Sequence, residues 1–125
     1  MRKIMLILAL VVMLVPLSAA AALAYDQLIQ CKSVPCYGSG GDDKILERKG
    51  NGLYDKIIVR GGYDLVQANG YGNDTDVVKG GTGYDKINVA DGDELDTASG
   101  GAGRDWCIVD ARKEATASCA RVTVR

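Results

Sequence analysis

The chain has 125 residues and a net charge of −1, contains 16 glycines, and lacks both histidine and phenylalanine. This charge gives no reason to expect a nucleic-acid partner, because phosphate binding requires an excess of lysine and arginine. The lack of histidine also removes the side chain that most often acts as a general acid or base in catalysis.

The first 24 residues have the three parts of a secretory signal peptide. A positively charged start precedes an apolar run over residues 4–15 and a small-residue exit, Ala-Leu-Ala, at residues 22–24. We predict a signal helix, cleavage before Tyr25, and a mature chain that is secreted and has no membrane span. A membrane anchor is the alternative, but Pro16 interrupts a run that would need about 20 apolar residues to cross a bilayer.

Four cysteines remain in the mature chain, and a secreted protein favours disulfides over free thiols. We favour the pairs Cys31–Cys36 and Cys107–Cys119, because each is close in sequence and the two pairs flank the middle of the chain. Free buried thiols or a zinc site are the alternatives. Zinc fits poorly, because there is no histidine and the cysteine spacings are unusual for a zinc site.

Glycines are confined to the middle of the chain, where they form a repeat. Residues 80–88 and 100–108 both fit the pattern G-G-x-G-x-D-x-U-x, in which U is apolar, and residues 38–46 and 59–67 are looser copies. The sixth-position aspartates of these copies lie 20 or 21 residues apart. They are Asp43, Asp64, Asp85 and Asp105.

A second aspartate series lies between the members of the first at the same interval. It comprises Asp55, Asp76 and Asp96. Every aspartate of both series precedes a short strand-like segment. These segments are residues 44–46, 56–59, 65–67, 77–79, 86–89, 97–99 and 106–109, of which 97–99 is the weakest. The pattern predicts a coil with two strands per turn, in which each aspartate series forms a column down one edge.

Strand residues alternate between the two faces of a sheet, so the residue two places after each aspartate is expected to point inward. One inner stack would contain Ile45, Val66, Ile87 and Cys107, and the other Ile57, Val78 and Ala98. Glycines before the aspartates permit positive φ and close approach between loops. The predicted fold class is therefore all-β, a parallel β-roll or β-solenoid of about three to four short two-stranded turns.

Stacked aspartates imply a cation. Successive turns lie about 4.8 Å apart, where two carboxylates repel by about 1 kcal/mol in water and about 3 to 4 kcal/mol at an effective dielectric of about 20. A divalent ion between them replaces repulsion with attraction, and calcium prefers carboxylate and backbone carbonyl oxygens. A solvated turn residue is the alternative for any single aspartate. Two phased columns favour calcium as a cofactor.

These motifs resemble the hemolysin-type calcium-binding repeats, the RTX nonapeptide family. The resemblance covers residues 38–108 and is strongest at 80–88 and 100–108. It implies a parallel β-roll that holds calcium ions between the loops of adjacent turns. The implied ligands are the aspartates of the first series and the glycine-loop carbonyls at Gly81, Gly83, Gly101 and Gly103.

The second series departs from the family pattern. Its loops are longer and contain fewer glycines, and Leu53 and Tyr54 directly precede Asp55. We include Asp55, Asp76 and Asp96 as candidate calcium ligands. These loops either bind calcium differently, through Asp74, Asp91 or Asp93, or bind none.

The tail after the last repeat resembles the capping segment that follows degenerate repeats of this family. We expect the Cys107–Cys119 disulfide to close the last turn and Cys31–Cys36 to close the first. The predicted organisation is a signal peptide (1–24), an N-terminal cap (25–37), a calcium-binding β-roll (38–109) and a C-terminal cap (110–125).

The predicted function is that of a secreted calcium-binding module with a structural or interaction role, whose partner is an extracellular or cell-surface ligand. A polysaccharide-active enzyme is one alternative, because paired carboxylates such as Asp74 and Asp76 can serve glycoside hydrolysis. No nucleophile and base stand at a recognisable spacing, so we expect no enzyme. A surface- or ice-binding solenoid is another alternative, but the threonines do not share one repeat position.

Three tyrosines precede aspartates of the two series, namely Tyr54, Tyr63 and Tyr84. They suggest either a ladder on which a ligand stacks or packing that shields the loops. The sequence alone favours the packing role.

Overall fold

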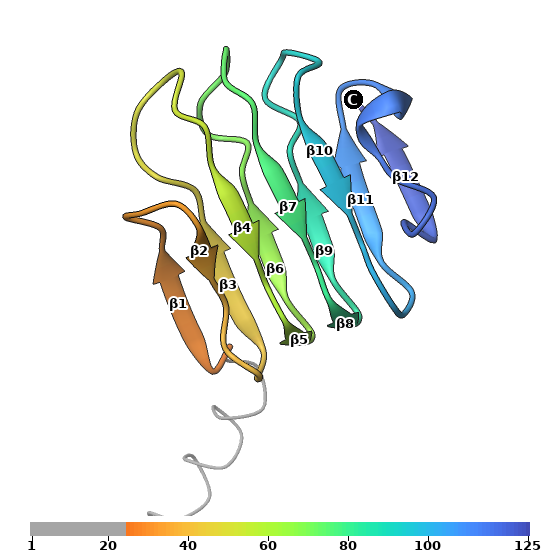
Figure 1. Cartoon of the computed structure of the whole chain (residues 1–125). Helices are drawn as coiled ribbons and strands as arrows, with labels where there is room; N and C mark the ends of the chain where they lie inside the picture. The colour runs from red at the N-terminus through yellow and green to blue at the C-terminus, as the bar shows by residue number, and fades with distance from the viewer. Residues whose placement is uncertain (1–24) are drawn as a thin grey trace, which may run out of the picture.

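The computed structural model describes residues 25–125, and these residues form a parallel β-solenoid of about four turns (Figure 1). The predicted all-β fold class is confirmed. The predicted signal segment, with its helix and its cleavage site, lies outside the described residues. Within residues 25–125 no helix has the length and apolarity needed to cross a membrane.

Three parallel sheets wind along the solenoid. The six-stranded sheet contains, in spatial order, β1 (Gln27–Gln30), β3 (Asp43–Leu46), β6 (Leu65–Gln67), β9 (Lys86–Asn88), β11 (Trp106–Val109) and β12 (Arg121–Val124). The four-stranded sheet contains β10 (Thr97–Ser99), β7 (Val77–Lys79), β4 (Lys56–Ile58) and β2 (Cys36–Tyr37). A two-stranded sheet pairs β5 (Gly61–Gly62) with β8 (Thr82–Gly83), so the glycine loops add a short third strand that the two-strand prediction lacked.

The core follows the predicted inward stacks. Ile45, Val66, Ile87 and Cys107 lie in register across neighbouring strands of the six-stranded sheet, and Ile57, Val78 and Ala98 do so in the four-stranded sheet. All seven side chains are fully buried. A second inward position, not predicted, adds the buried residues Val59, Ala68, Val89 and Val109.

Two edges connect the large sheets, and we name them by the strands that they precede. The first edge comprises the loops that lead into the six-stranded sheet, and it carries β5 and β8 at the bottom of Figure 1. The second edge comprises the loops that lead into the four-stranded sheet, at the top of the same view. The aspartates of the first series lie at the first edge, and those of the second series lie at the second edge.

The first edge is built from closely stacked glycine loops. Gly103 has a φ of 126°, and a Cβ added there would lie only 1.8 Å from the carbonyl oxygen of Gly83 on the preceding turn. Arg60 adopts a φ of 86° at the position where Gly81 has 91°. The loops therefore require a left-handed backbone, and the stacked turns leave no room for a side chain at Gly81 or Gly103.

Disulfides join both predicted cysteine pairs, Cys31–Cys36 and Cys107–Cys119. They lie in the first and last turns, as expected, and they fit an oxidising environment. The segments predicted as caps continue the solenoid itself. β1 pairs in parallel with β3, and β12 pairs in parallel with β11, while the 3-10 helix η2 (Arg112–Glu114) lies between β11 and β12.

Candidate metal centres

Carboxylates of the first aspartate series line up along the first edge and are all buried. Asp64, Asp85 and Asp105 each accept a hydrogen bond from the backbone N–H of the aspartate on the preceding turn, whereas Asp43, on the first turn of the series, accepts hydrogen bonds from the N–H and Oγ of Ser39. The N–H of Asp43 donates to Oδ1 of Asp64 (2.7 Å), that of Asp64 to Asp85 (3.1 Å), and that of Asp85 to Asp105 (2.9 Å). These three carboxylates thereby hold successive turns in register.

The second series forms the same ladder along the second edge. The N–H of Asp55 donates to Oδ1 of Asp76 (3.0 Å), and that of Asp76 to Asp96 (2.7 Å). The N–H of Asp96 then donates to Oε1 of Glu114 (3.1 Å), so a glutamate of η2 occupies the next position of the column. Sequence reasoning missed Glu114, because it lies outside the repeat and its longer side chain reaches the column from a different backbone position.

One oxygen of each accepting carboxylate receives the hydrogen bond from the neighbouring turn, and the other oxygen takes no part in this ladder. In five aspartates this oxygen is buried and has no hydrogen-bond partner among the described residues; they are Asp64, Asp76, Asp85, Asp96 and Asp105. Burial of an unpaired charged oxygen is strongly unfavourable. A proton, a cation or a bound water must therefore compensate each of them.

Burial raises the pKa of four of these aspartates, namely Asp64, Asp76, Asp85 and Asp96. It is the main cause that raises the pKa of Asp76 and of Asp85 to about 8, and that of Asp96 to about 7. Nearby carboxylates raise these pKa values further, Asp74 acting on Asp76 and Asp64 acting on Asp85. Without a cation, Asp76, Asp85 and Asp96 therefore retain protons near neutral pH.

Clusters of three carboxylates that could hold a metal ion occur at the second edge. In each cluster, one oxygen from every member lies within 4.8 Å of the others. The clusters are Asp74–Asp76–Asp96, Asp74–Asp91–Asp93, Glu47–Asp55–Asp76 and Asp93–Asp96–Glu114. Within residues 25–125 no comparable cluster occurs at the first edge, which the family resemblance favoured.

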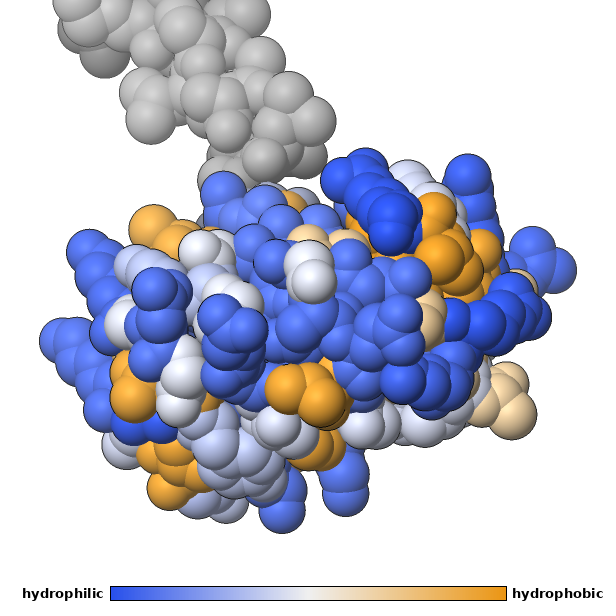
Figure 2. Space-filling model, turned by 90° about the horizontal axis from the view of Figure 1, so that it is seen from above, coloured by the Kyte–Doolittle hydropathy of each residue, from blue (hydrophilic) through white to orange (hydrophobic). Residues whose placement is uncertain are grey.

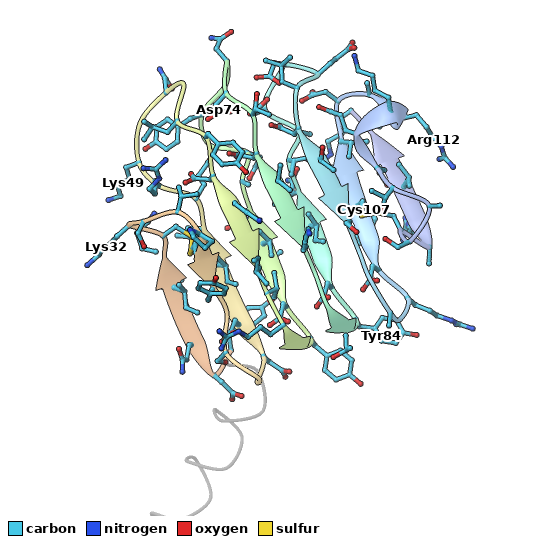
Figure 3. All side chains as sticks on the ribbon, in the orientation of Figure 1. Lys32, Lys49, Asp74, Tyr84, Cys107 and Arg112 are labelled. Carbon is cyan, nitrogen blue, oxygen red and sulfur yellow. A yellow bond between two sulfur atoms is a disulfide. The ribbon has the colours of Figure 1, made fainter. Side chains whose placement is uncertain are left out.

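Loop length explains this difference between the edges. The glycine loops of the first edge are short and closely stacked, and the other acids there, Asp26 and Asp42, belong to no three-carboxylate cluster. The longer loops of the second edge bring Asp74, Asp91 and Asp93 beside the column, and the N–H of Asp74 donates to Oδ2 of Asp93 (3.3 Å). Figure 2 looks onto this edge, where most of the surface is hydrophilic, and Figure 3 labels Asp74 there.

The cluster of Asp74, Asp76 and Asp96, here called the Asp74 centre, has the most complete set of free oxygens. Its three side chains are no more than 5% exposed, and each has one buried oxygen without a hydrogen-bond partner. Burial, together with the charges of Asp91 and Asp93, raises the pKa of Asp74 to about 6. Asp91 adds a further unpartnered oxygen beside Asp74.

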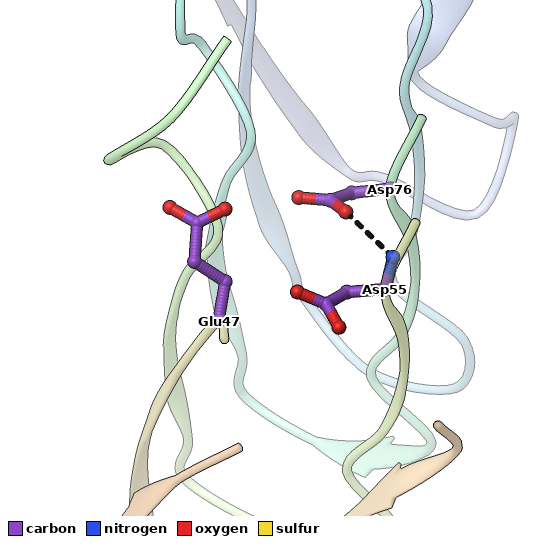
Figure 4. A group of neighbouring side chains, drawn as sticks. All are labelled: Glu47, Asp55 and Asp76. Atoms are coloured by element: carbon purple, nitrogen blue, oxygen red, sulfur yellow. Dashed lines mark hydrogen bonds between the residues drawn. The ribbon is translucent and has the colours of Figure 1, made fainter. Parts of the chain in front are cut away.

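The cluster of Glu47, Asp55 and Asp76 is partly neutralised (Figure 4). Its glutamate faces the two aspartates from the opposite side of the solenoid edge. Arg48 forms an ion pair with Asp55, with Nε 2.6 Å from Oδ1, and Glu47 accepts a hydrogen bond from the N–H of Gly70. This cluster is therefore less suited to a cation than the Asp74 centre.

The predicted glycine ligands contribute to the stacking of the loops. The carbonyl oxygen of Gly81 accepts a hydrogen bond from Ala102 on the next turn (2.8 Å), and the N–H of Gly83 donates to the carbonyl of Ala102 (3.0 Å). Gly101 has a φ of 89°, and a Cβ added there would lie 2.2 Å from the Gly81 carbonyl oxygen. All four predicted glycines thus lie at close contacts between turns.

Searches with this chain match no protein-family model, no curated protein and no solved structure. The resemblance to calcium-binding nonapeptide repeats therefore stays a prediction from the motifs. The fold and the aligned carboxylates are established by the structure itself.

Proposed function

We propose that this protein is a secreted, calcium-binding solenoid whose ions stabilise a structural or interaction module. The observation that carries the proposal is the Asp74 centre, where three buried carboxylates each leave one oxygen without a partner. A cation that enters this cluster removes both the desolvation cost and the mutual repulsion of the carboxylates. The aspartate columns of both edges provide further positions for ions.

The donor set supports calcium over other metals. All candidate ligands are oxygens, which favours hard cations, and both cysteine pairs are consumed in disulfides. Calcium holds its ligands at about 2.3–2.6 Å, so oxygens within 4.8 Å of one another fit into one coordination sphere. Magnesium requires shorter, near-octahedral contacts and retains more of its water.

The two disulfides support the same conclusion. Disulfides persist in oxidising compartments, and extracellular modules bind calcium with dissociation constants on the order of 10⁻⁴–10⁻³ M. A cluster of protonatable, mutually repelling carboxylates is suited to such modest affinity. We therefore expect the ions to add rigidity to the solenoid where calcium is abundant.

Calorimetric titration of the chelator-treated protein with calcium chloride tests this proposal. We expect Asp74→Asn to weaken the strongest binding step at least tenfold, because it removes a carboxylate that two clusters share. Glu94→Gln is the matched control, because Glu94 lies in the same edge but belongs to none of the clusters and is 61% exposed. Undiminished calcium binding by a folded Asp74→Asn variant would contradict the proposal.

A further inference from the structure

A groove crosses the turns of the solenoid beside the first edge, away from the Asp74 centre. It has a volume of about 380 Å³, and a depression of about 510 Å³ adjoins it around Tyr84, Arg104 and Trp106. Residues from successive turns line it. We call it the aromatic groove and define it by Tyr25, Tyr63, Tyr84, Lys86, Arg104 and Trp106.

Tyrosine rings stand exposed along this groove. Tyr63 and Tyr84 occupy the same position of successive turns, their ring centroids are 5.8 Å apart, and their planes are tilted by 44°. The two residues are 61% and 50% exposed. Rings that shielded the loops would lose more of their surface to burial, so this geometry favours the ligand-stacking role over the packing role.

Trp106 fixes two cations beside the tyrosines. Its ring lies 4.4 Å from Nζ of Lys86 and 4.3 Å from Cζ of Arg121, which come from β9 and β12 on the two sides of β11. The indole N–H donates to Oγ1 of Thr123 (2.9 Å), which orients the ring. Cation–π contacts of this kind hold the charges in place without neutralising them.

These cations lack acidic partners. Across residues 25–125 the only ion pairs are Arg48–Asp55 and Lys113–Glu94, so Lys86, Arg104 and Arg121 are not paired with any carboxylate of this region. The exposed charge of the groove is therefore available for an anionic ligand.

We propose that the aromatic groove binds an acidic polysaccharide built from uronic acids. The apolar C–H face of a sugar ring packs on the exposed tyrosine rings, and the uronate carboxylates meet the cations. A groove that crosses several turns suits an extended chain with a regular repeat. Leu65 is the single aliphatic residue among the groove-lining residues, so the groove offers little to the apolar side chains of a peptide.

The charge balance favours a polysaccharide over a nucleic acid. Three aspartates also line the groove, namely Asp42, Asp64 and Asp85, and the protein as a whole is slightly acidic. The carboxylates of Asp64 and Asp85 are buried, whereas Lys86 and Arg104 are exposed to a ligand. A phosphate backbone requires a larger excess of basic residues than this surface supplies. The proposal is independent of the Asp74 centre, which lies at the second edge.

Fluorescence of Trp106 reports occupancy directly, because this is the single tryptophan of the chain. The purified protein is titrated with hyaluronan octasaccharide, a uronate oligomer that calcium does not gel, in calcium and in chelator. We expect a saturable change in fluorescence that added sodium chloride weakens. Chitohexaose, which carries no carboxylate, and oligo-dT are titrated in parallel and are expected to bind at least tenfold more weakly.

Variants at the groove provide the second readout, by calorimetry with the same octasaccharide. Tyr84→Ala and Arg104→Ala are each expected to weaken binding at least tenfold, whereas Tyr84→Phe retains it. Tyr54→Ala and Lys79→Ala are matched controls on exposed residues outside the groove and should bind as the wild type does. No binding of hyaluronan by the wild-type protein, equal binding of chitohexaose, or preferential binding of oligo-dT would each overturn the proposal.

Calcium binding is measured in its own titration, apart from the hyaluronan experiment. Loss of calcium binding in Asp74→Asn with hyaluronan binding intact would support both proposals, and failure of either one leaves the other measurable. Both proposals therefore have independent outcomes.

Discussion

The two edges of the solenoid carry the same ladder of carboxylates and backbone N–H groups but are built from different loops. Glycine loops at the first edge stack so closely that their backbones form a sheet of their own, β5 with β8. Loops at the second edge are longer, and additional acids gather there. The same repeat therefore gives two kinds of edge, because the longer loops of the second edge bring additional carboxylates beside the aspartate column.

Close stacking at the first edge predicts the largest effect. Gly103→Ala places a Cβ against the Gly83 carbonyl at a φ that alanine rarely adopts. We expect a loss of about 4 kcal/mol or more in the free energy of unfolding, measured by thermal and urea unfolding.

Gly92→Ala at the second edge is the control for this substitution. Gly92 also has a positive φ, 103°, but nothing lies within 4 Å of an added Cβ. It should lose only the strain energy, about 1–2 kcal/mol. Equal losses at the two glycines would mean that stacking does not distinguish the edges.

The next largest difference between the edges is expected in the stabilisation that calcium provides. Asp76 and Asp85 are matched, because both are buried, belong to ladders, and have a pKa raised to about 8. At a calcium concentration of about 100 times the dissociation constant, binding stabilises a protein by about 3 kcal/mol. Asp76→Asn should abolish most of this calcium-dependent gain in melting temperature, and Asp85→Asn should retain most of it. The reverse result would assign the stronger site to the first edge.

Both edges should respond alike to pH when calcium is absent. The aspartates have a higher pKa in the folded state than in the unfolded chain, so the folded state binds more protons between the two values. Stability in chelator should therefore fall by several kcal/mol as the pH rises from about 5 to about 8. Calcium should flatten this profile, as unfolding at a series of pH values would reveal. A chelator profile that rises over the same range would contradict the shifted pKa values.

Relief of backbone strain should give the smallest difference in stability between the two edges. Arg60 at the first edge adopts a left-handed φ of 86°, while its guanidinium lies 4.9 Å from the centroid of the Tyr37 ring. Arg60→Gly relieves strain but loses this contact, so we expect a net gain of about 0.5 kcal/mol. Asn73→Gly at the second edge should change stability by about zero, because asparagine tolerates its φ of 60°. Differential scanning calorimetry of the two variants would detect the contrast, and a loss at Arg60→Gly would show that the contact dominates.

Much of the fold could be predicted because the repeat fixes it. Aspartates 20 or 21 residues apart align along the two edges, and the apolar residue two places after each one points inward. The disulfide pairs also followed from position in the chain. These features depend on spacing, which a sequence records directly.

Clusters outside the repeat could not be predicted in the same way. Asp74 meets Asp91 and Asp93 across one turn of the second edge, and Glu114 enters the aspartate column from η2. Their positions depend on how irregular loops fold, and no repeat position marks them. The sequence nominated Asp74, Asp91 and Asp93 as alternatives, but it favoured the first edge.

The amino-acid sequence by itself therefore determined the solenoid, its two aspartate columns and its inward stacks, because a regular interval repeats the same local geometry on every turn. The tertiary structure alone decided which edge gathers three carboxylates around one point and where Trp106 holds Lys86 and Arg121 beside the exposed tyrosines. Those arrangements join residues from different turns through side-chain reach and loop shape, which depend on the folded backbone as a whole.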